Sequence, residues 1–394
     1  MEKKVWLISH CGPENIGGCE NATNIWVTEL IRRGANVTWL YPDRAKYRLD
    51  KNSNPSNEQL NVQVLETVNF PKIRRLVIPT TTSQIHFHRM YIDQKPDTII
   101  LNGYCSPLFQ DTLLASIRFC RRQPNIFHIF HGELGISPDL SPLTSLRRQI
   151  ISQLHFGLVN SFRNVKYIAV SESTRQQLLR SRFFSPDTNI DVVYPSSPDA
   201  CSQRRPEPDN NQNSFVATTV SRLSPGKGIE TLIDLATQAK KRNLPFQFNL
   251  VGPAHHQPYL DQTTAMFQGI VNLIGQKTGQ DLCLSYLNSD LSVMSSPAEG
   301  FGLVTVEALN HGVPVLATQI PATEEIFRHF NHLPGFLIPR LPNRSFDLNT
   351  ATDFMSRFAQ YPQLRSDLYK VTEPSRRIFN STSQTNRLAD LVLG

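Results

Sequence analysis

A glycine turn framed by two glutamates is the stretch of this sequence best suited to chemistry. Glu299 comes just before Gly300-Phe-Gly, and Glu307 lies in a short helix expected over 303–310. The first amides of a helix lack intrahelical partners, and with the helix dipole they bind anions such as a diphosphate. A carboxylate beside them can accept hydrogen bonds from vicinal hydroxyls. The pattern indicates a site for a sugar joined to a diphosphate, whereas either glutamate alone could be an ordinary solvated charge.

Two cations follow an earlier strand, expected at 215–220. Arg222 and Lys227 are separated by a Pro-Gly turn, and a helix is expected to begin near Gly228. A planar guanidinium fork and a compact ammonium group at a helix entrance can neutralise a diphosphate leaving group. The alternative is a solvated basic loop.

Strands and helices must position these residues. The chain alternates apolar strands with helical stretches in two series, which is typical of parallel, doubly wound sheets. Ligands bind such sheets beyond the carboxyl ends of the strands, where the candidate residues fall. A run rich in Pro, Ser and Asn separates the two series. We therefore expect an α/β chain with domains at 1–195 and 214–375, a linker at 196–213 and a terminal helix at 376–394.

The segment 295–318, SSPAEGFGLVTVEALNHGVPVLAT, resembles the signature of the retaining glycosyltransferases of family 4. The resemblance implies the GT-B fold, in which two Rossmann-like domains face a cleft and the terminal helix crosses back to the first domain. It implies that Glu299 is catalytic and contacts the transferred sugar, and that Glu307 holds the ribose. It assigns the contacts with sugar hydroxyls and phosphate to the backbone of Phe301, Gly302 and Leu303.

The same resemblance extends to the other strand ends. It implies that Arg222 and Lys227 neutralise the departing nucleotide diphosphate. Gly17 and Gly18, after the first strand, resemble the loop that the family places against donor and acceptor. His131, after the strand at 125–130, matches the kind of position that the family's catalytic histidine occupies, although a histidine there could simply be a hydrogen-bonded loop residue.

Two further residues are candidates for binding. The backbone near Gln276, at the end of another strand, is expected to contact the edge of the nucleotide base. Glu133, close to His131, is a candidate for contact with the acceptor. No residue is assigned to a metal ion, because enzymes of this type generally need none and no Asp-x-Asp motif falls near a strand end.

The excess positive charge lies in the first half of the chain. The net charge is +7, and residues 1–195 carry 23 Lys and Arg against 16 Asp and Glu, which accounts for all of it. Such a surface can attract anionic lipid or a phosphorylated acceptor, or merely aid solubility. Residues 71–78 and 118–122 mix basic with apolar residues, which leaves open a peripheral contact with an anionic membrane. Without a recognisable binding motif, we expect no nucleic-acid partner.

We expect a cytoplasmic protein, either free or peripheral on the inner face of the membrane. No apolar run is long enough to span a bilayer, and the N-terminal apolar stretch is too short for a signal peptide. The six cysteines form no C-x-x-C pair, so reduced thiols are expected.

These observations favour a retaining glycosyltransferase. It would move a sugar from a nucleoside-diphosphate sugar to a glycan, lipid-linked or small-molecule acceptor, without a metal cofactor. Two alternatives stay open: a nucleotide-sugar epimerase of the same fold, and a non-catalytic subunit that binds a nucleotide sugar.

Overall fold

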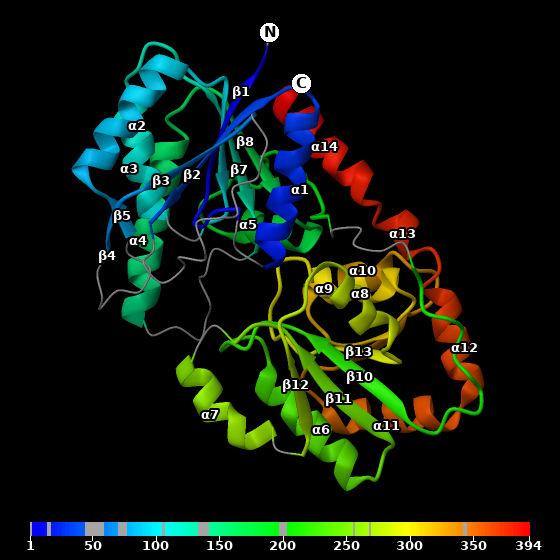
Figure 1. Cartoon of the computed structure of the whole chain (residues 1–394). Coiled ribbons are helices and arrows are strands. Elements are labelled where there is room, and N and C mark those ends of the chain that lie inside the picture. Colours follow the sequence, from blue (N-terminus) through cyan, green and yellow to red (C-terminus); the bar gives the residue numbers. More distant parts are fainter. Residues whose placement is uncertain are drawn as a thin grey trace. The chain divides into compact units, whose positions relative to one another are not determined.

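The computed structural model divides the chain into two compact units, each built around a parallel sheet (Figure 1). The first unit comprises Met1–Ser196 and Thr382–Gly394, and the second comprises Ser197–Ser381. The structure describes residues 2–13, 17–43, 59–69, 77–104, 107–132, 142–196, 203–254, 257–267, 269–341 and 345–394.

The first unit contains a seven-stranded parallel sheet with the order β3-β2-β1-β6-β7-β8-β9. Its strands are β1 (Lys4–Ile8), β2 (Asn36–Pro42), β3 (Leu60–Leu65), β6 (Thr98–Asn102), β7 (Asn125–Phe130), β8 (Val165–Ala169) and β9 (Ile190–Val192). A separate antiparallel pair is formed by β4 (Thr67–Asn69) and β5 (Val77–Pro79). The helices are α1 (Gly18–Arg32), α2 (Thr81–Gln94), α3 (Pro107–Ile117), α4 (Pro142–Val159) and α5 (Glu172–Arg180).

The central strands of this sheet are buried along almost their whole length. All five residues of β6, Thr-Ile-Ile-Leu-Asn, are buried, as are four of the five in β1. Helices cover both faces of a parallel sheet, so its strands read as nearly continuous apolar runs. The chain moves from β1 outward through β2 to β3, then returns to place β6 on the other side of β1. The carboxyl ends of β1 and β6 therefore form the switch point of this sheet.

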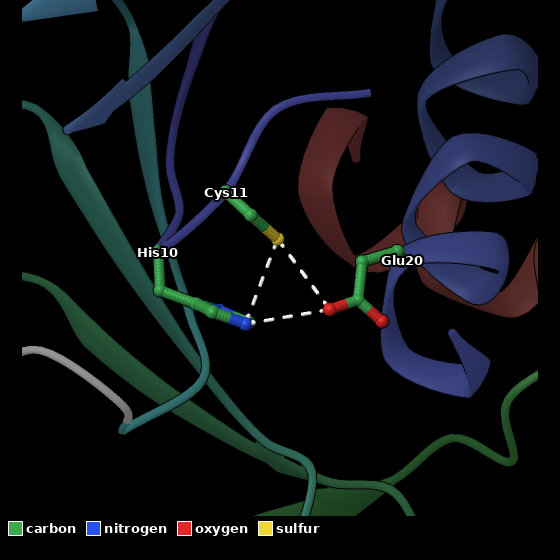
Figure 2. A group of neighbouring side chains, drawn as sticks. All are labelled: His10, Cys11 and Glu20. Atoms are coloured by element: carbon green, nitrogen blue, oxygen red, sulfur yellow. Dashed lines mark hydrogen bonds and ion pairs between the residues drawn. The ribbon is translucent and has the colours of Figure 1, made fainter. Parts of the chain in front are cut away.

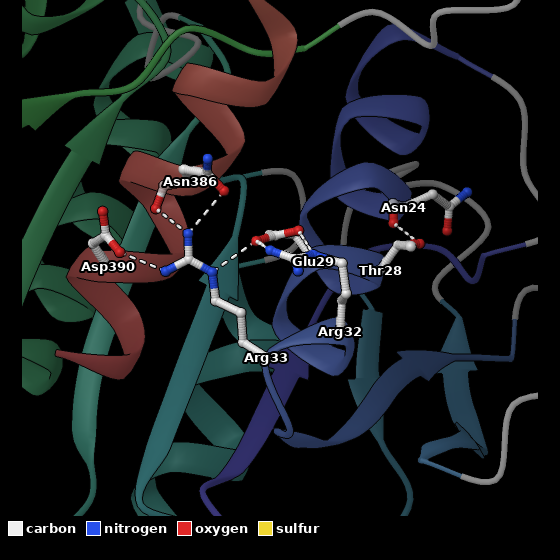
Figure 3. A network of polar contacts seen from close by, with 7 residues as sticks. All are labelled: Asn24, Thr28, Glu29, Arg32, Arg33, Asn386 and Asp390. Atoms are coloured by element: carbon white, nitrogen blue, oxygen red, sulfur yellow. Dashed lines mark hydrogen bonds and ion pairs between the residues drawn. The ribbon is translucent and has the colours of Figure 1, made fainter.

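The C-terminal helix α14 (Ser381–Leu393) returns to the first unit and packs beside α1 (Figure 3). Arg33 joins the two helices: its guanidinium donates to Glu29 at 2.7 Å and to the Asn386 side chain at 2.8 Å, and it pairs with Asp390. The hydrogen bonds from Arg32 and Arg33 lower the pKa of Glu29 from 4.5 to about 2. The predicted fold class, with two α/β units and a terminal helix that returns to the first, is confirmed.

Arg33→Ala should loosen α14. The substitution removes the hydrogen bonds to Asn386 and Asp390, and we expect the first unit to lose about 1 kcal/mol of stability. Hydrogen exchange of the amides in 382–394 should become faster. Arg32→Ala is the matched control, because Arg32 contacts Glu29 but not α14 and its side chain is 68% exposed. Equal exchange in both variants would contradict the role of Arg33.

The ion pairs of Glu29 with Arg32 and Arg33 should also depend on pH. Because the pKa of Glu29 is lower in the folded state, the contribution of its carboxylate to the free energy of unfolding is fully present above pH 4.5 and is lost as the pH falls towards 2.

The second unit contains a six-stranded parallel sheet with the order β12-β11-β10-β13-β14-β15. Its strands are β10 (Phe215–Val220), β11 (Phe246–Val251), β12 (Val271–Gly275), β13 (Leu291–Met294), β14 (Val315–Thr318) and β15 (Gly335–Ile338). The helices are α6 (Ile229–Lys241), α7 (Gln257–Phe267), α8 (Gly279–Leu287), α9 (Leu303–Asn310), α10 (Pro321–Arg328), α11 (Leu348–Gln360), α12 (Pro362–Val371) and α13 (Ser375–Ile378).

Residues 203–213, the described part of the segment expected to be a linker, are anchored to the second unit. Arg205 is 8% exposed, and its side chain donates a hydrogen bond to Asp290 at 2.6 Å. Its backbone N–H donates to the carbonyl of His311 at 2.9 Å. Arg204 donates to the hydroxyl of Thr372 at 2.8 Å. Polar composition suggested a free linker, but two arginines fix it to the unit.

Two other observations bear on the sequence expectations. Cys283, buried in α8, is disulfide-bonded, which corrects the expectation that all six thiols are reduced. Spacing along the chain could not show this, because a disulfide depends on proximity in the fold. Among the described residues, no helix combines the length and apolar character needed to cross a bilayer.

Candidate active site

The carboxyl ends of β10 and β13 lie side by side at the switch point of the second sheet. The chain runs from β10 through β11 to β12, then returns to pair β13 with the free side of β10. Open α/β sheets bind ligands at such points. Lys227 follows β10 and Glu299 follows β13, and Lys227 Nζ lies 2.7 Å from Glu299 Oε1. The fold thus brings two of the predicted catalytic residues into one ion pair.

Gly228 allows the loop that carries Lys227 to approach β13 closely. It has a φ of +66°, and a Cβ at this position would lie 1.9 Å from the carbonyl oxygen of Ser295. Only glycine fits this combination of left-handed backbone and direct backbone contact. The side chains of Lys227 and Glu299 remain 27% and 18% exposed, so a ligand can reach the pair.

A second glycine sets the start of α9. Gly302, with a φ of +92°, is the N-cap of this helix and offers no side chain to cap the first amides. Phe301 is buried and its ring lies 6.0 Å from that of Phe379 in an edge-on arrangement. The turn is therefore held by packing, while the amides at Leu303 and beyond lie at the positive end of the α9 dipole. This arrangement suits a phosphate group.

Glu307, one turn into α9, is held by a buried tyrosine. The hydroxyl of Tyr286, in α8, donates to Glu307 Oε2 at 2.9 Å, and its ring stacks on His311 with centroids 5.1 Å apart. Burial and the neighbouring Glu307 charge raise the pKa of Tyr286 well above 10, so the phenol stays protonated and keeps donating. Tyr286 is a positioning residue that the sequence did not reveal, since it reads as one more apolar-face residue of α8.

The structure does not bring the other predicted residues of this unit into contact with the pair. Arg222 follows β10 and is exposed, and its guanidinium forms no ion pair within the described part of the chain. Gln276 follows β12 and is also exposed. Both lie at the carboxyl edge of the sheet, where a ligand would meet them, and their roles stay predictions.

In the first unit, His131 is held by a chain of hydrogen bonds at the ends of β6 and β7. Thr23 donates its hydroxyl to the carbonyl of Cys19 at 2.7 Å and accepts from Asn102 Nδ2 at 2.9 Å. The amide oxygen of Asn102 therefore faces His131 Nε2, 2.8 Å away, and accepts a hydrogen bond from its N–H group. This arrangement leaves Nδ1 of His131 as a hydrogen-bond acceptor.

Burial lowers the pKa of His131 to about 4, while the charge of Glu20 raises it slightly and that of His10 lowers it slightly. The imidazole is therefore neutral near pH 7, and it can position a hydroxyl but not supply a positive charge. Gly17 is the N-cap of α1 and Gly18 its first residue. Glu133 lies outside the described residues.

Two family models match the chain, one over each half. The model described as Glycosyltransferase Family 4 matches residues 16–196, and the model described as Glycosyl transferases group 1 matches residues 202–345. The chain belongs to the group 1 and family 4 glycosyltransferases. The second match contains the Lys227–Glu299 pair and the start of α9.

Solved structures agree with this assignment at the level of the fold. The chain is similar to HepE from Anabaena, solved in complex with UDP and glucose, with a TM-score of 0.73, 19% identity and 100% of both chains covered. This glycosyltransferase chain thus has the GT-B fold that the resemblance implied.

Curated relatives match over shorter segments. The peptide N-acetylglucosaminyltransferase GtfA subunit of Streptococcus agalactiae, which uses UDP-N-acetylglucosamine by name, is 28% identical over 199 residues, which is 50% of this chain and 37% of that protein. Trehalose synthase of Pyrococcus horikoshii is 26% identical over 230 residues, covering 52% of this chain and 53% of that protein. The matched segments thus span about half or less of these relatives.

Proposed function

We propose that this glycosyltransferase moves a sugar from a nucleoside-diphosphate sugar to a glycan, lipid-linked or small-molecule acceptor, with retention at the anomeric carbon. The observation that carries the proposal is the Lys227–Glu299 ion pair beside the uncapped start of α9. It joins a cation for the diphosphate, a carboxylate for sugar hydroxyls and a helix N-terminus at one switch point.

The positive charges near the start of α9 could stabilise a diphosphate leaving group. As the bond between the anomeric carbon and the diphosphate oxygen breaks, negative charge grows on the leaving group, and Lys227, Arg222 and the α9 dipole would stabilise it. The acceptor oxygen would then bond to the same face of the carbon, and its proton would pass to the departing phosphate oxygen.

The remaining assignments rest on the family resemblance and on the local contacts of each residue. Glu307, oriented by Tyr286, would accept hydrogen bonds from the ribose hydroxyls. Neutral His131 would accept a hydrogen bond from a sugar hydroxyl through Nδ1. Backbone near Gly17, Gly18 and Gln276 would complete contacts with the donor, and Glu133 would contact the acceptor.

A thermal-shift screen tests the proposal, with UDP, GDP, ADP and their common sugars as ligands. Uridine diphosphate is the first candidate, because HepE was solved with UDP and the streptococcal relative is named for a UDP-sugar. We expect one nucleotide to raise the melting temperature, by mass action on the folded state. EDTA should leave this shift unchanged, since protein cations neutralise the diphosphate. A folded sample that responds to no nucleotide would contradict the proposal.

A peripheral contact with an anionic membrane is part of the proposal, and Phe119 is the residue that supports it. Its side chain is 88% exposed just after α3, with the guanidinium of Arg118 5.1 Å from the ring centroid. An apolar side chain such as Phe119 among basic residues suits an interface of anionic headgroups. In the same unit, α4 exposes a further apolar row, in which Leu146, Ile150 and Leu154 are 54%, 49% and 63% exposed.

Phe119→Ser should therefore weaken binding to vesicles of anionic phospholipid. Loss of a buried aromatic side chain from the lipid is worth about 1.5–3 kcal/mol, which is roughly 10- to 100-fold in partition coefficient. Cosedimentation at low salt measures it, with Leu333→Ser as the control, because Leu333 is 58% exposed in the second unit. If the wild type does not sediment, or if both variants behave alike, this surface is not the membrane contact.

A further inference from the structure

Three side chains with metal-binding atoms converge at the switch point of the first unit. His10 and Cys11 follow β1, and Glu20 lies in the first turn of α1 (Figure 2). His10 Nε2 lies 3.5 Å from Cys11 Sγ and 3.4 Å from Glu20 Oε1, and Cys11 Sγ lies 3.5 Å from the same Glu20 oxygen. One nitrogen, one sulfur and one oxygen thus form a nearly equilateral triangle.

The triangle has the dimensions of one face of a zinc tetrahedron. Zinc binds nitrogen and oxygen at about 2.0–2.1 Å and sulfur at about 2.3 Å, so neighbouring ligand atoms in a tetrahedral site lie about 3.3–3.6 Å apart. All three observed separations fall in this range. An ion above the triangle would need no side chain to move far, and a fourth position would remain for water or another ligand.

The surroundings also suit a bound cation. The side chain of Glu20 is only 8% exposed, and a bound cation would stabilise a carboxylate at such a buried position. His10 is 19% exposed, which leaves a path from solvent. Trp39 fixes the backbone beside the thiol, since its indole N–H donates to the carbonyl of Cys11 at 3.0 Å. Mixed nitrogen, sulfur and carboxylate ligands favour zinc over the harder ions magnesium and calcium.

We propose that His10 Nε2, Cys11 Sγ and Glu20 Oε1 form a zinc-binding site in the first unit. This departs from the sequence-based expectation that no residue binds a metal, but not from the metal-independent neutralisation of the donor diphosphate, which involves residues of the second unit. The alternative is a metal-free cluster in which the thiol and the imidazole donate to Glu20. Zinc binding would displace the thiol proton and tie the end of β1 to the start of α1.

Cobalt(II) spectroscopy on the whole chain tests the site. The protein would be stripped with a chelator, reduced with a phosphine and titrated with Co²⁺, whose tetrahedral thiolate complexes show intense visible bands and a sulfur-to-metal charge-transfer band. We expect one Co²⁺ per chain with both features, and displacement by Zn²⁺ that abolishes them. No stoichiometric binding, or an octahedral spectrum without the charge-transfer band, would overturn the proposal.

Two variants assign the sulfur and oxygen ligands, and a third is their control. Cys11→Ser should abolish the charge-transfer band, and Glu20→Gln should weaken Zn²⁺ binding by at least about 100-fold, because even loss of an outer-sphere partner lowers affinity about 10- to 100-fold. Cys120→Ser is the matched control, since Cys120, like Cys11, is a partly exposed cysteine of this unit outside any disulfide. An unchanged band in Cys11→Ser would overturn the assignment, as would its loss in Cys120→Ser. The wild-type titration decides the matter even if a variant fails to fold.

Discussion

Replacing Lys227 with Met should lower kcat for sugar transfer, or for slow donor hydrolysis, by about 10²- to 10³-fold, the usual effect of removing one group that stabilises developing negative charge. Methionine keeps the length of the side chain but removes the ammonium group. The substitution would also leave the carboxylate of Glu299, which lies 2.7 Å from Lys227 Nζ in the wild type, without this cation. Its negative charge would then repel the diphosphate.

Release of nucleoside diphosphate from the donor measures the effect of Lys227→Met. Lys241→Met is the control, because Lys241 is an exposed lysine at the end of α6 in the same unit. Both variants should fold, since Lys227 is partly exposed. A Lys227→Met enzyme with nearly wild-type kcat would show that this ammonium group does not serve the leaving group.

Glu307→Ala should weaken binding of a nucleoside diphosphate by roughly 10- to 100-fold, since hydrogen bonds to a charged group contribute about 1.5–3 kcal/mol each. The structural reason is that Tyr286 holds the carboxylate at a fixed position, where ribose hydroxyls can donate to it. Pyrophosphate has no ribose, so its affinity should stay unchanged. Isothermal titration with both ligands separates the ribose contact from the diphosphate contact.

Tyr286→Phe completes that comparison. It removes only the phenol hydroxyl that orients Glu307, so we expect a loss smaller than that of Glu307→Ala and again confined to the nucleotide. If Glu307→Ala weakens pyrophosphate and nucleotide equally, the residue supports the turn rather than the ribose. If Tyr286→Phe exceeds Glu307→Ala, the tyrosine acts through packing.

Much of the fold follows from apolar patterning. Strands such as β6 and β13 are buried along their whole length, and this environment favours the mainly apolar runs that the sequence displays. The order of strands brings sequence-distant strand ends together, as it does for Lys227 and Glu299. The prediction was that Lys227 neutralises the diphosphate and that Glu299 contacts the sugar joined to it, and the ion pair is compatible with that prediction.

Contacts between elements that meet only in the folded structure could not be read from the sequence. Tyr286 reaches Glu307 because α8 lies against α9, and its neighbours in the sequence give no sign of it. Asn102 and Thr23 orient His131 from two other elements for the same reason. Arg205 lies in a run whose composition is that of a linker, yet it is buried against Asp290. The composition of a segment indicates whether it is exposed on average, whereas the burial of one residue in an ion pair depends on which residues lie beside it in the fold.

The stereochemistry of transfer tests the central claim most directly. The donor identified by the thermal-shift screen would be incubated with the wild type, with and without candidate acceptors, and the anomeric proton of the first-formed product followed by NMR. We predict that the product has the anomeric configuration of the donor, that nucleoside diphosphate appears in equal amount, and that Glu299→Gln forms little of either. A product of inverted configuration would contradict the account, as would turnover in Glu299→Gln at the wild-type rate.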